Sequence, residues 1–194
     1  MTVTVIDPAA ALIVVDLQQG IVTATLAHPV GRVIENSAAL LTAFRDRGLP
    51  VVLVNVAGSP PGRTDARPGG AAPRAVPDGW TDLIPELGRQ PGDITVTKHA
   101  RSAFSGTGLA QALRDRGVTQ VVIAGIATSS GVESTARDAH ELGFNVTLAA
   151  DAMTDSELAR HEHSVTRVFP RIAETGTTAD ILAALAGPPA DSPG

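Results

Sequence analysis

The feature that most constrains the fold of this chain is an alternation of short apolar runs with longer amphipathic segments. The runs are rich in Val, Ile and Ala, and most of them lack a period-2 alternation of apolar and polar residues. That pattern is typical of strands covered by helices on both faces, as in a parallel sheet. The predicted strands are Ala10–Asp16, Val51–Val56, Ile94–Lys98, Gln120–Ile126, Asn145–Asp151 and, more weakly, Arg171–Thr175.

The intervening segments have helical periodicity, and several of them end in a glycine at the position of a C-terminal cap. The predicted helices are Gly31–Arg47, Trp80–Gly88, Thr107–Arg116, Val132–Leu142, Ser156–Phe169 and Thr177–Ala186. The capping glycines are Gly48, Gly88, Gly117 and Gly143. Strands that alternate with helices predict an open α/β sheet with right-handed crossovers.

The chain has 194 residues, which favours one domain over residues 1–186, followed by a disordered tail over 187–194 (GPPADSPG). One internal segment breaks the rhythm. Residues 57–78 contain five prolines, four glycines and three arginines, among them Arg63. A connection of this length is either a solvated surface loop or a lid or binding loop.

Composition excludes several classes of protein. The chain contains no cysteine, so disulfides, thiolate metal sites and a thiol nucleophile are excluded. A net charge of −5 and an aromatic content of 3% argue against a nucleic-acid partner. No apolar stretch approaches the roughly 18 residues that would cross a membrane, and no signal peptide is visible at the start. We therefore expect a cytoplasmic protein with no membrane partner.

Polar residues follow three of the predicted strands, where ligands of open α/β sheets bind. Asp16 ends the first strand, and Lys98, the only lysine of the chain, ends the third. A carboxylate after the apolar residues LIVV is poorly hydrated and needs a partner, for which Lys98 is the candidate. A purely structural ion pair is the alternative interpretation.

The fourth strand leads through small residues directly into a helix. The turn contains Thr128, Ser129, Ser130 and Gly131, whose backbone N–H groups predict a site for an anion or a developing oxyanion. A serine that caps the helix explains the same sequence and is compatible with that role. No histidines have metal-ligand spacing, since His161 and His163 are two residues apart, and no phosphate-binding loop is present. We expect neither a metal nor a cofactor.

Three blocks together resemble the isochorismatase-like hydrolases of the cysteine hydrolase superfamily. They are IVVDLQQG, VTKHARSAFSGTGL and VVIAGIATSSGVESTARDAHELGFNVTLAADAMTD. The resemblance implies a three-layer α/β/α sandwich around a six-stranded, mostly parallel sheet. It also implies an active site of Asp, Lys and Cys, which Asp16 and Lys98 match, whereas Gly131 occupies the cysteine position. A cis peptide between Ile126 and Ala127 is a further implication.

The missing thiol disfavours the amidases of this family and favours the vinyl-ether hydrolysis of isochorismatases, in which the aspartate is the general acid. We therefore expect a hydrolase of a small acidic metabolite, with Asp16 as acid or base and Lys98 orienting it. The substrate would contact residues 126–130, an apolar wall of Phe104 or Trp80, and an arginine such as Arg63. The family resemblance also implies a homo-oligomer, a dimer or a tetramer.

Three alternatives remain beside this interpretation. Ser130 could replace the thiol if Asp16 serves as its base. The chain could instead be a non-catalytic member of the same fold that binds a small acidic ligand. A flavodoxin-like cofactor-binding protein is disfavoured, because neither a phosphate loop nor stacking aromatics are present.

Overall fold

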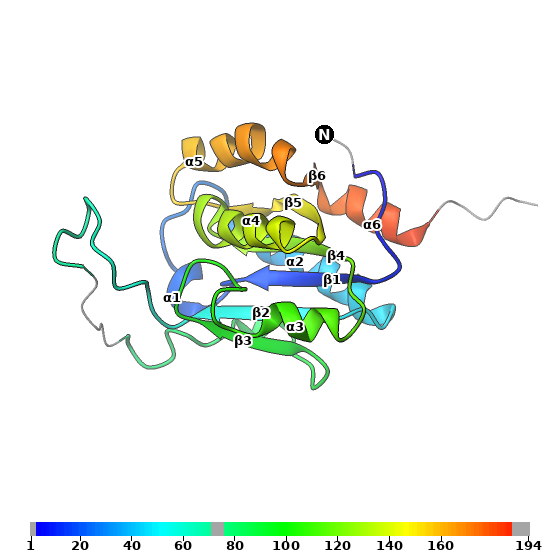
Figure 1. Ribbon diagram of the computed structural model, residues 1–194, viewed down its shortest axis with the longest axis horizontal. Helices are drawn as coiled ribbons and strands as arrows, with labels where there is room; N and C mark the ends of the chain where they lie inside the picture. The colour runs from blue at the N-terminus through cyan, green and yellow to red at the C-terminus, as the bar shows by residue number, and fades with distance from the viewer. Residues whose placement is uncertain (1–2, 71–75, 188–194) are drawn as a thin grey trace, which may run out of the picture.

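The computed structural model describes residues 3–70 and 76–187, so the predicted tail beyond Gly187 lies outside the described residues. Its centre is a six-stranded sheet in the order β3-β2-β1-β4-β5-β6, in which every neighbouring pair is parallel (Figure 1). The strands are β1 (Ala10–Val15), β2 (Val51–Val56), β3 (Ile94–Lys98), β4 (Gln120–Ile126), β5 (Asn145–Thr154) and β6 (Glu174–Gly176). The predicted open α/β sheet is therefore confirmed.

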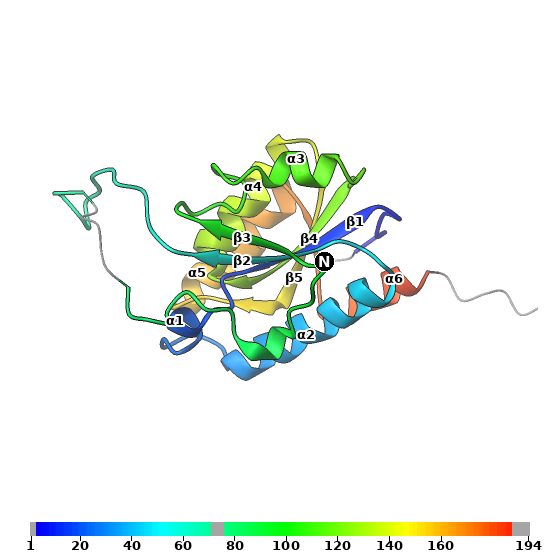
Figure 2. The same cartoon turned by 90° about the horizontal axis from the view of Figure 1, so that it is seen from below.

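Helices cover both faces of this sheet. Figure 2 shows α3 and α4 on one face and α2 and α6 on the other. The helices are α1 (Gln19–Val22), α2 (Val30–Asp46), α3 (Leu109–Arg114), α4 (Glu133–Glu141), α5 (Leu158–His163) and α6 (Thr178–Ala186). Two π-helical turns, Thr128–Val132 and Ser164–Val168, precede α4 and follow α5. None of the described helices has the length and apolarity needed to cross a membrane.

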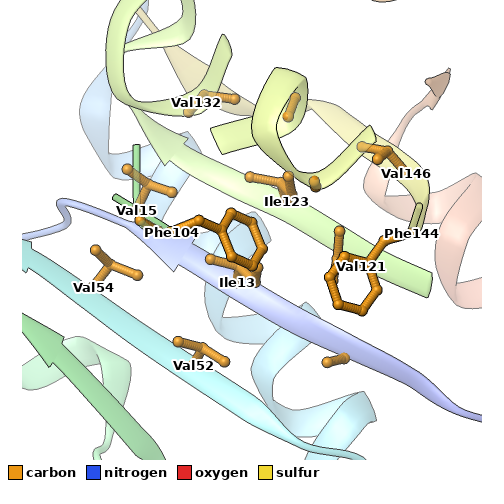
Figure 3. Close-up of a cluster of buried hydrophobic side chains, with 14 of the residues drawn as sticks. Ile13, Val15, Val52, Val54, Phe104, Val121, Ile123, Val132, Phe144 and Val146 are labelled. Carbon is orange, nitrogen blue, oxygen red and sulfur yellow. The ribbon is translucent and has the colours of Figure 1, made fainter. Parts of the chain in front are cut away.

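The two helical layers explain why β1 shows no alternation of apolar and polar residues. All six residues of β1 are buried. Ile13 and Val15 face a core cluster shared with α3 and α4, which Figure 3 shows around Phe104 and Phe144. Leu12 and Val14 face a second cluster that includes side chains of α2 and α6. Because both faces of β1 are covered, a residue of this strand can contact a ligand only at the end of the strand.

Three predicted elements differ clearly from the structure, and a proline lies in or next to each of them. Only Pro85–Leu87 of the predicted helix 80–88 is helical, as one 3-10 turn, because Ile84 before the proline is extended (ψ 144°). The predicted helix 156–169 is shorter and passes into a π-helical turn. Around Pro170 the chain forms another 3-10 turn, Phe169–Arg171, so β6 begins only at Glu174.

One glycine allows an unusually close approach of two strands next to the candidate site. Gly125 of β4 has a φ of +115°, and a Cβ atom there would lie 2.0 Å from the carbonyl oxygen of Val15. The neighbouring backbone of β1 could not move away without disturbing Asp16. Gly125 therefore holds the end of β4 against the end of β1.

Candidate active site

The site is centred on a buried ion pair at the carboxyl edge of the sheet. The Nζ atom of Lys98, at the end of β3, lies 2.7 Å from Oδ2 of Asp16, directly after β1. Both residues are nearly inaccessible, at 4% exposure for Asp16 and 2% for Lys98. Among the described residues, Asp16 is the one non-glycine with positive φ (53°), a conformation that recurs at functional sites.

The carboxyl group of Asp16 is prepared to exchange a proton near neutral pH. Burial raises the pKa of Asp16 to about 6, although the ammonium of Lys98 acts in the opposite direction. Its Oδ2 atom is held by Lys98, whereas Oδ1 is buried without a hydrogen-bond partner among the described residues. Oδ1 is thus the carboxylate oxygen that no other described residue holds.

The turn after β4 lies beside this carboxylate. The peptide bond between Ile126 and Ala127 is cis, and the π-helical turn begins at Thr128. A Cβ atom at Gly131 would lie 3.3 Å from Oδ2 of Asp16 and 3.0 Å from a methyl group of Val15. A side chain at position 131 would therefore contact the carboxylate, and glycine leaves the approach to Asp16 open.

A cavity of about 560 Å³ connects these groups to solvent. It brings together most of the predicted site residues: Asp16, Arg63, Lys98, Ile126, Ala127, Ser130 and Gly131. It adds Arg67 of the 57–70 loop, another of the arginines predicted to meet an acidic substrate, and Arg101 from the segment after β3, which sequence reasoning did not select. Figures 1 and 2 show that loop extending beyond the carboxyl ends of β2 and β3. Four cationic groups and one carboxylate line the cavity, which favours an anionic ligand.

Two predicted wall residues do not reach this cavity. The ring of Phe104 belongs to the core, where it stacks on Phe144 with the ring centroids 6.0 Å apart. Trp80 lies against α1, so closely that a Cβ atom at Gly20 would be 2.0 Å from its ring. Neither ring therefore forms the predicted apolar wall of this cavity, because Phe104 packs on Phe144 and Trp80 packs on Gly20.

Two of the four backbone N–H groups in the predicted anion nest over Thr128–Gly131 have partners within the protein. The N–H group of Ser129 donates to Oδ2 of Asp155 at 2.7 Å, and that of Ser130 donates to the carbonyl of Ala127 at 3.0 Å. Thr128 is fully buried and does not line the cavity. The N–H groups of Ser129 and Ser130 are thus not free donors, and the turn contributes the surfaces of Ser130 and Gly131 to the cavity.

Sequence reasoning missed a polar cluster behind this turn. Thr128 Oγ1 lies 2.9 Å from Nδ1 of His161, whose ring meets that of His28 edge-on at 4.7 Å. The separation of His28 and His161 along the chain gives no sign of this contact, since they are 133 residues apart. Among residues 3–70 and 76–187, no group of three or more potential ligands could hold a metal ion.

Comparisons with known proteins agree with the geometry. A family model described as the isochorismatase domain matches residues 10–180. The chain is 39% identical over 178 residues to the isochorismatase family protein YwoC of Bacillus subtilis, covering 89% of this chain and 92% of that protein. It is 30% identical over 184 residues to maleamate amidohydrolase of Pseudomonas putida, and the match covers 89% of this chain and 84% of that protein. A solved structure of an isochorismatase family protein from Burkholderia thailandensis superposes with a TM-score of 0.87 at 39% identity. The match covers 94% of this chain and 98% of that one.

Proposed function

Since the chain belongs to the isochorismatase family, we propose that it hydrolyses a small anionic metabolite with water as the nucleophile and Asp16 as the proton-transferring group. One observation carries the proposal. The carboxyl group of Asp16 is buried at the base of the cavity, with one oxygen held by Lys98 and the other without a partner among the described residues. A buried ion pair has little stabilising value by itself, which favours a chemical role.

The reaction that fits this arrangement is hydrolysis of a vinyl ether. Protonated Asp16 transfers its proton to the terminal vinyl carbon, and the ether oxygen stabilises the resulting cation. Water adds to the cationic carbon and returns a proton to Asp16. The hemiketal then separates into a ketone and an alcohol, so no covalent enzyme intermediate forms.

The absence of cysteine supports this route over amide cleavage through a thioester. Some relatives are amidohydrolases by name, such as the Pseudomonas putida protein. By resemblance, Gly131 occupies the position at which such enzymes keep a cysteine, and this chain has none anywhere. Gly131 has no side chain to attack a carbonyl, so we assign the nucleophile to water; Ser130, which also lines the cavity, would instead form a covalent intermediate.

A substrate screen tests the proposal. Small vinyl ethers, amides and esters that carry a carboxylate are incubated with the protein, and products and protein mass are followed. We expect turnover of vinyl ethers and no mass increase of the protein. If no compound turns over, yet carboxylates change the fluorescence of Trp80, the single tryptophan, the alternative of a non-catalytic binding protein is favoured instead.

The pH dependence of turnover follows from the acid role. Asp16 must be protonated at the start of the reaction, and burial raises its pKa to about 6. We therefore expect kcat/KM to be highest below pH 6 and to fall about tenfold for each pH unit above it. Initial rates across that range give the measurement. A rate that instead rises through pH 6 would assign Asp16 the role of a base.

The arginines of the cavity predict an effect on substrate binding. Arg101→Ala is expected to raise KM for an anionic substrate by about tenfold, with little change in kcat, since this exposed guanidinium lines the cavity and attracts the substrate before and during reaction alike. Steady-state kinetics at low and high salt measure the effect, which salt should weaken. Arg171→Ala, an exposed arginine that does not line the cavity, is the matched control.

A further inference from the structure

The polar cluster behind the turn connects three distant parts of the chain. His28 precedes α2, Asp155 follows β5, and His161 lies in α5. The backbone N–H of Ala27 donates to the carbonyl of Asp155 at 2.8 Å, and the ring of His28 lies against that of His161. None of these three residues lines the cavity.

Two side chains of this cluster hold the turn directly. His161 contacts the hydroxyl of Thr128, and Asp155 accepts the N–H of Ser129. Asp155 is 2% exposed, and its other oxygen accepts the N–H of Ser156 at 2.8 Å. Farther along the same segment, the hydroxyl of Ser164 donates to Glu133 at the start of α4, at 2.7 Å. The segment from Asp155 to Ser164 is thus fastened to both ends of the turn.

A hydroxyl next to an imidazole is also the arrangement of an activated nucleophile. Thr128 does not fit that role, because it is fully buried and does not line the cavity. A substrate could not reach its Oγ1 atom. The contact between Thr128 and His161 therefore acts on the geometry of the turn.

We propose that His161 is a positioning residue for the cavity: its neutral imidazole accepts the Thr128 hydroxyl and so holds Ser130 and Gly131 beside Asp16, and protonation of the imidazole reverses this hydrogen bond and loosens the hold. A protonated imidazole has only donors, so the buried hydroxyl of Thr128 would lose the acceptor of its hydrogen. An effect of His161 on catalysis rests on the proposed function, whereas the coupling between His161 and the turn can be tested without measuring turnover.

The surroundings of His161 decide when the change occurs. Burial, followed by the nearby His28, lowers the pKa of His161, while Asp155 and Glu162 oppose that change. The turn packed against it, residues 128–132, contributes no titratable side chain. The neutral form therefore dominates at pH 7, and the hold is lost as the pH falls through the lowered pKa.

Nuclear magnetic resonance tests this coupling. The experiment uses Asp16→Asn, so that the titration of Asp16 does not contribute, and follows the backbone amides of Ser130 and Gly131 from about pH 8 to about pH 5. We expect both amides to shift with the same midpoint as the ring of His161. Adding His161→Asn, which keeps an acceptor near the position of Nδ1, should abolish this shift and leave the amides at their pH 8 positions.

Two further variants separate positioning from a general structural role. Thr128→Val should leave the ring of His161 titrating while the Gly131 amide no longer follows it. His163→Asn, which changes the exposed histidine of the same helix, should leave the coupling intact. Amides that stay constant in Asp16→Asn, or that still follow His161 in Thr128→Val, would overturn the inference. Neither result depends on whether the protein turns over any substrate.

Discussion

Asp16→Asn is expected to lower kcat/KM for the hydrolysed substrate by about 100- to 10,000-fold, the range that a positioned general acid contributes. The asparagine amide occupies the same volume beside Lys98 but does not transfer a proton as the carboxylic acid does. The unpartnered Oδ1 atom of Asp16 is the point from which that transfer would proceed. Steady-state kinetics on a substrate found in the screen measure the loss.

A control at another aspartate distinguishes this loss from a general effect of removing charge. Asp115→Asn changes an exposed carboxylate at the end of α3, which is remote from the cavity lining. We expect it to keep the activity of the wild type. Equal turnover by the wild type and Asp16→Asn would show that Asp16 is not a catalytic residue.

Lys98→Met is expected to reduce the free energy of unfolding by about 3–5 kcal/mol at pH 8, as is usual when one partner of a buried ion pair is removed. The methionine keeps most of the volume, but the Asp16 carboxylate loses the cation 2.7 Å away. Since Lys98 lowers the pKa of Asp16, the variant should hold the proton to higher pH. Urea unfolding at several pH values provides the measurement.

The sign of the pH effect follows from linkage. The pKa of Asp16 is raised from 3.8 to about 6, so its favourable contribution is complete below pH 3.8 and is lost as the pH rises through 6. In Lys98→Met the pKa of Asp16 is higher, so the free energy of unfolding goes on falling to a higher pH than in the wild type. The difference in stability between the two proteins should therefore shrink as the pH is lowered from 8 to 5. Asp16→Asn/Lys98→Met should recover much of the stability at pH 8. Strictly additive losses would show that the two groups do not interact.

The core of the candidate site could be predicted because strand order brings strand ends together. The apolar run before Asp16 predicted a buried strand, and a carboxylate at the end of such a strand requires a partner. Lys98 also ends a strand, so both side chains reach the same edge of a parallel sheet. The positions of the strand ends and the free-energy cost of burying an unpaired charge are therefore enough to predict the Asp16–Lys98 pair.

Side-chain partners across the fold could not be predicted in the same way. Phe104 looks available in the sequence, yet it packs on Phe144, which follows α4. Trp80 uses the space left by Gly20, and the sequence gives no sign of that pairing. His161 meets Thr128 only because α5 folds back over the turn. Each contact depends on packing angles, which local periodicity does not encode.

The order of strands in the sheet has a consequence for biosynthesis. Asp16 leaves the ribosome 82 residues ahead of its partner Lys98. A nascent chain that ends before β4 contains β1, β2 and β3, which are neighbours in the sheet, yet it still lacks Ile126, Ala127, Ser130 and Gly131 of the cavity lining. The complete lining of the cavity therefore exists only in a chain that has been synthesised at least as far as Gly131.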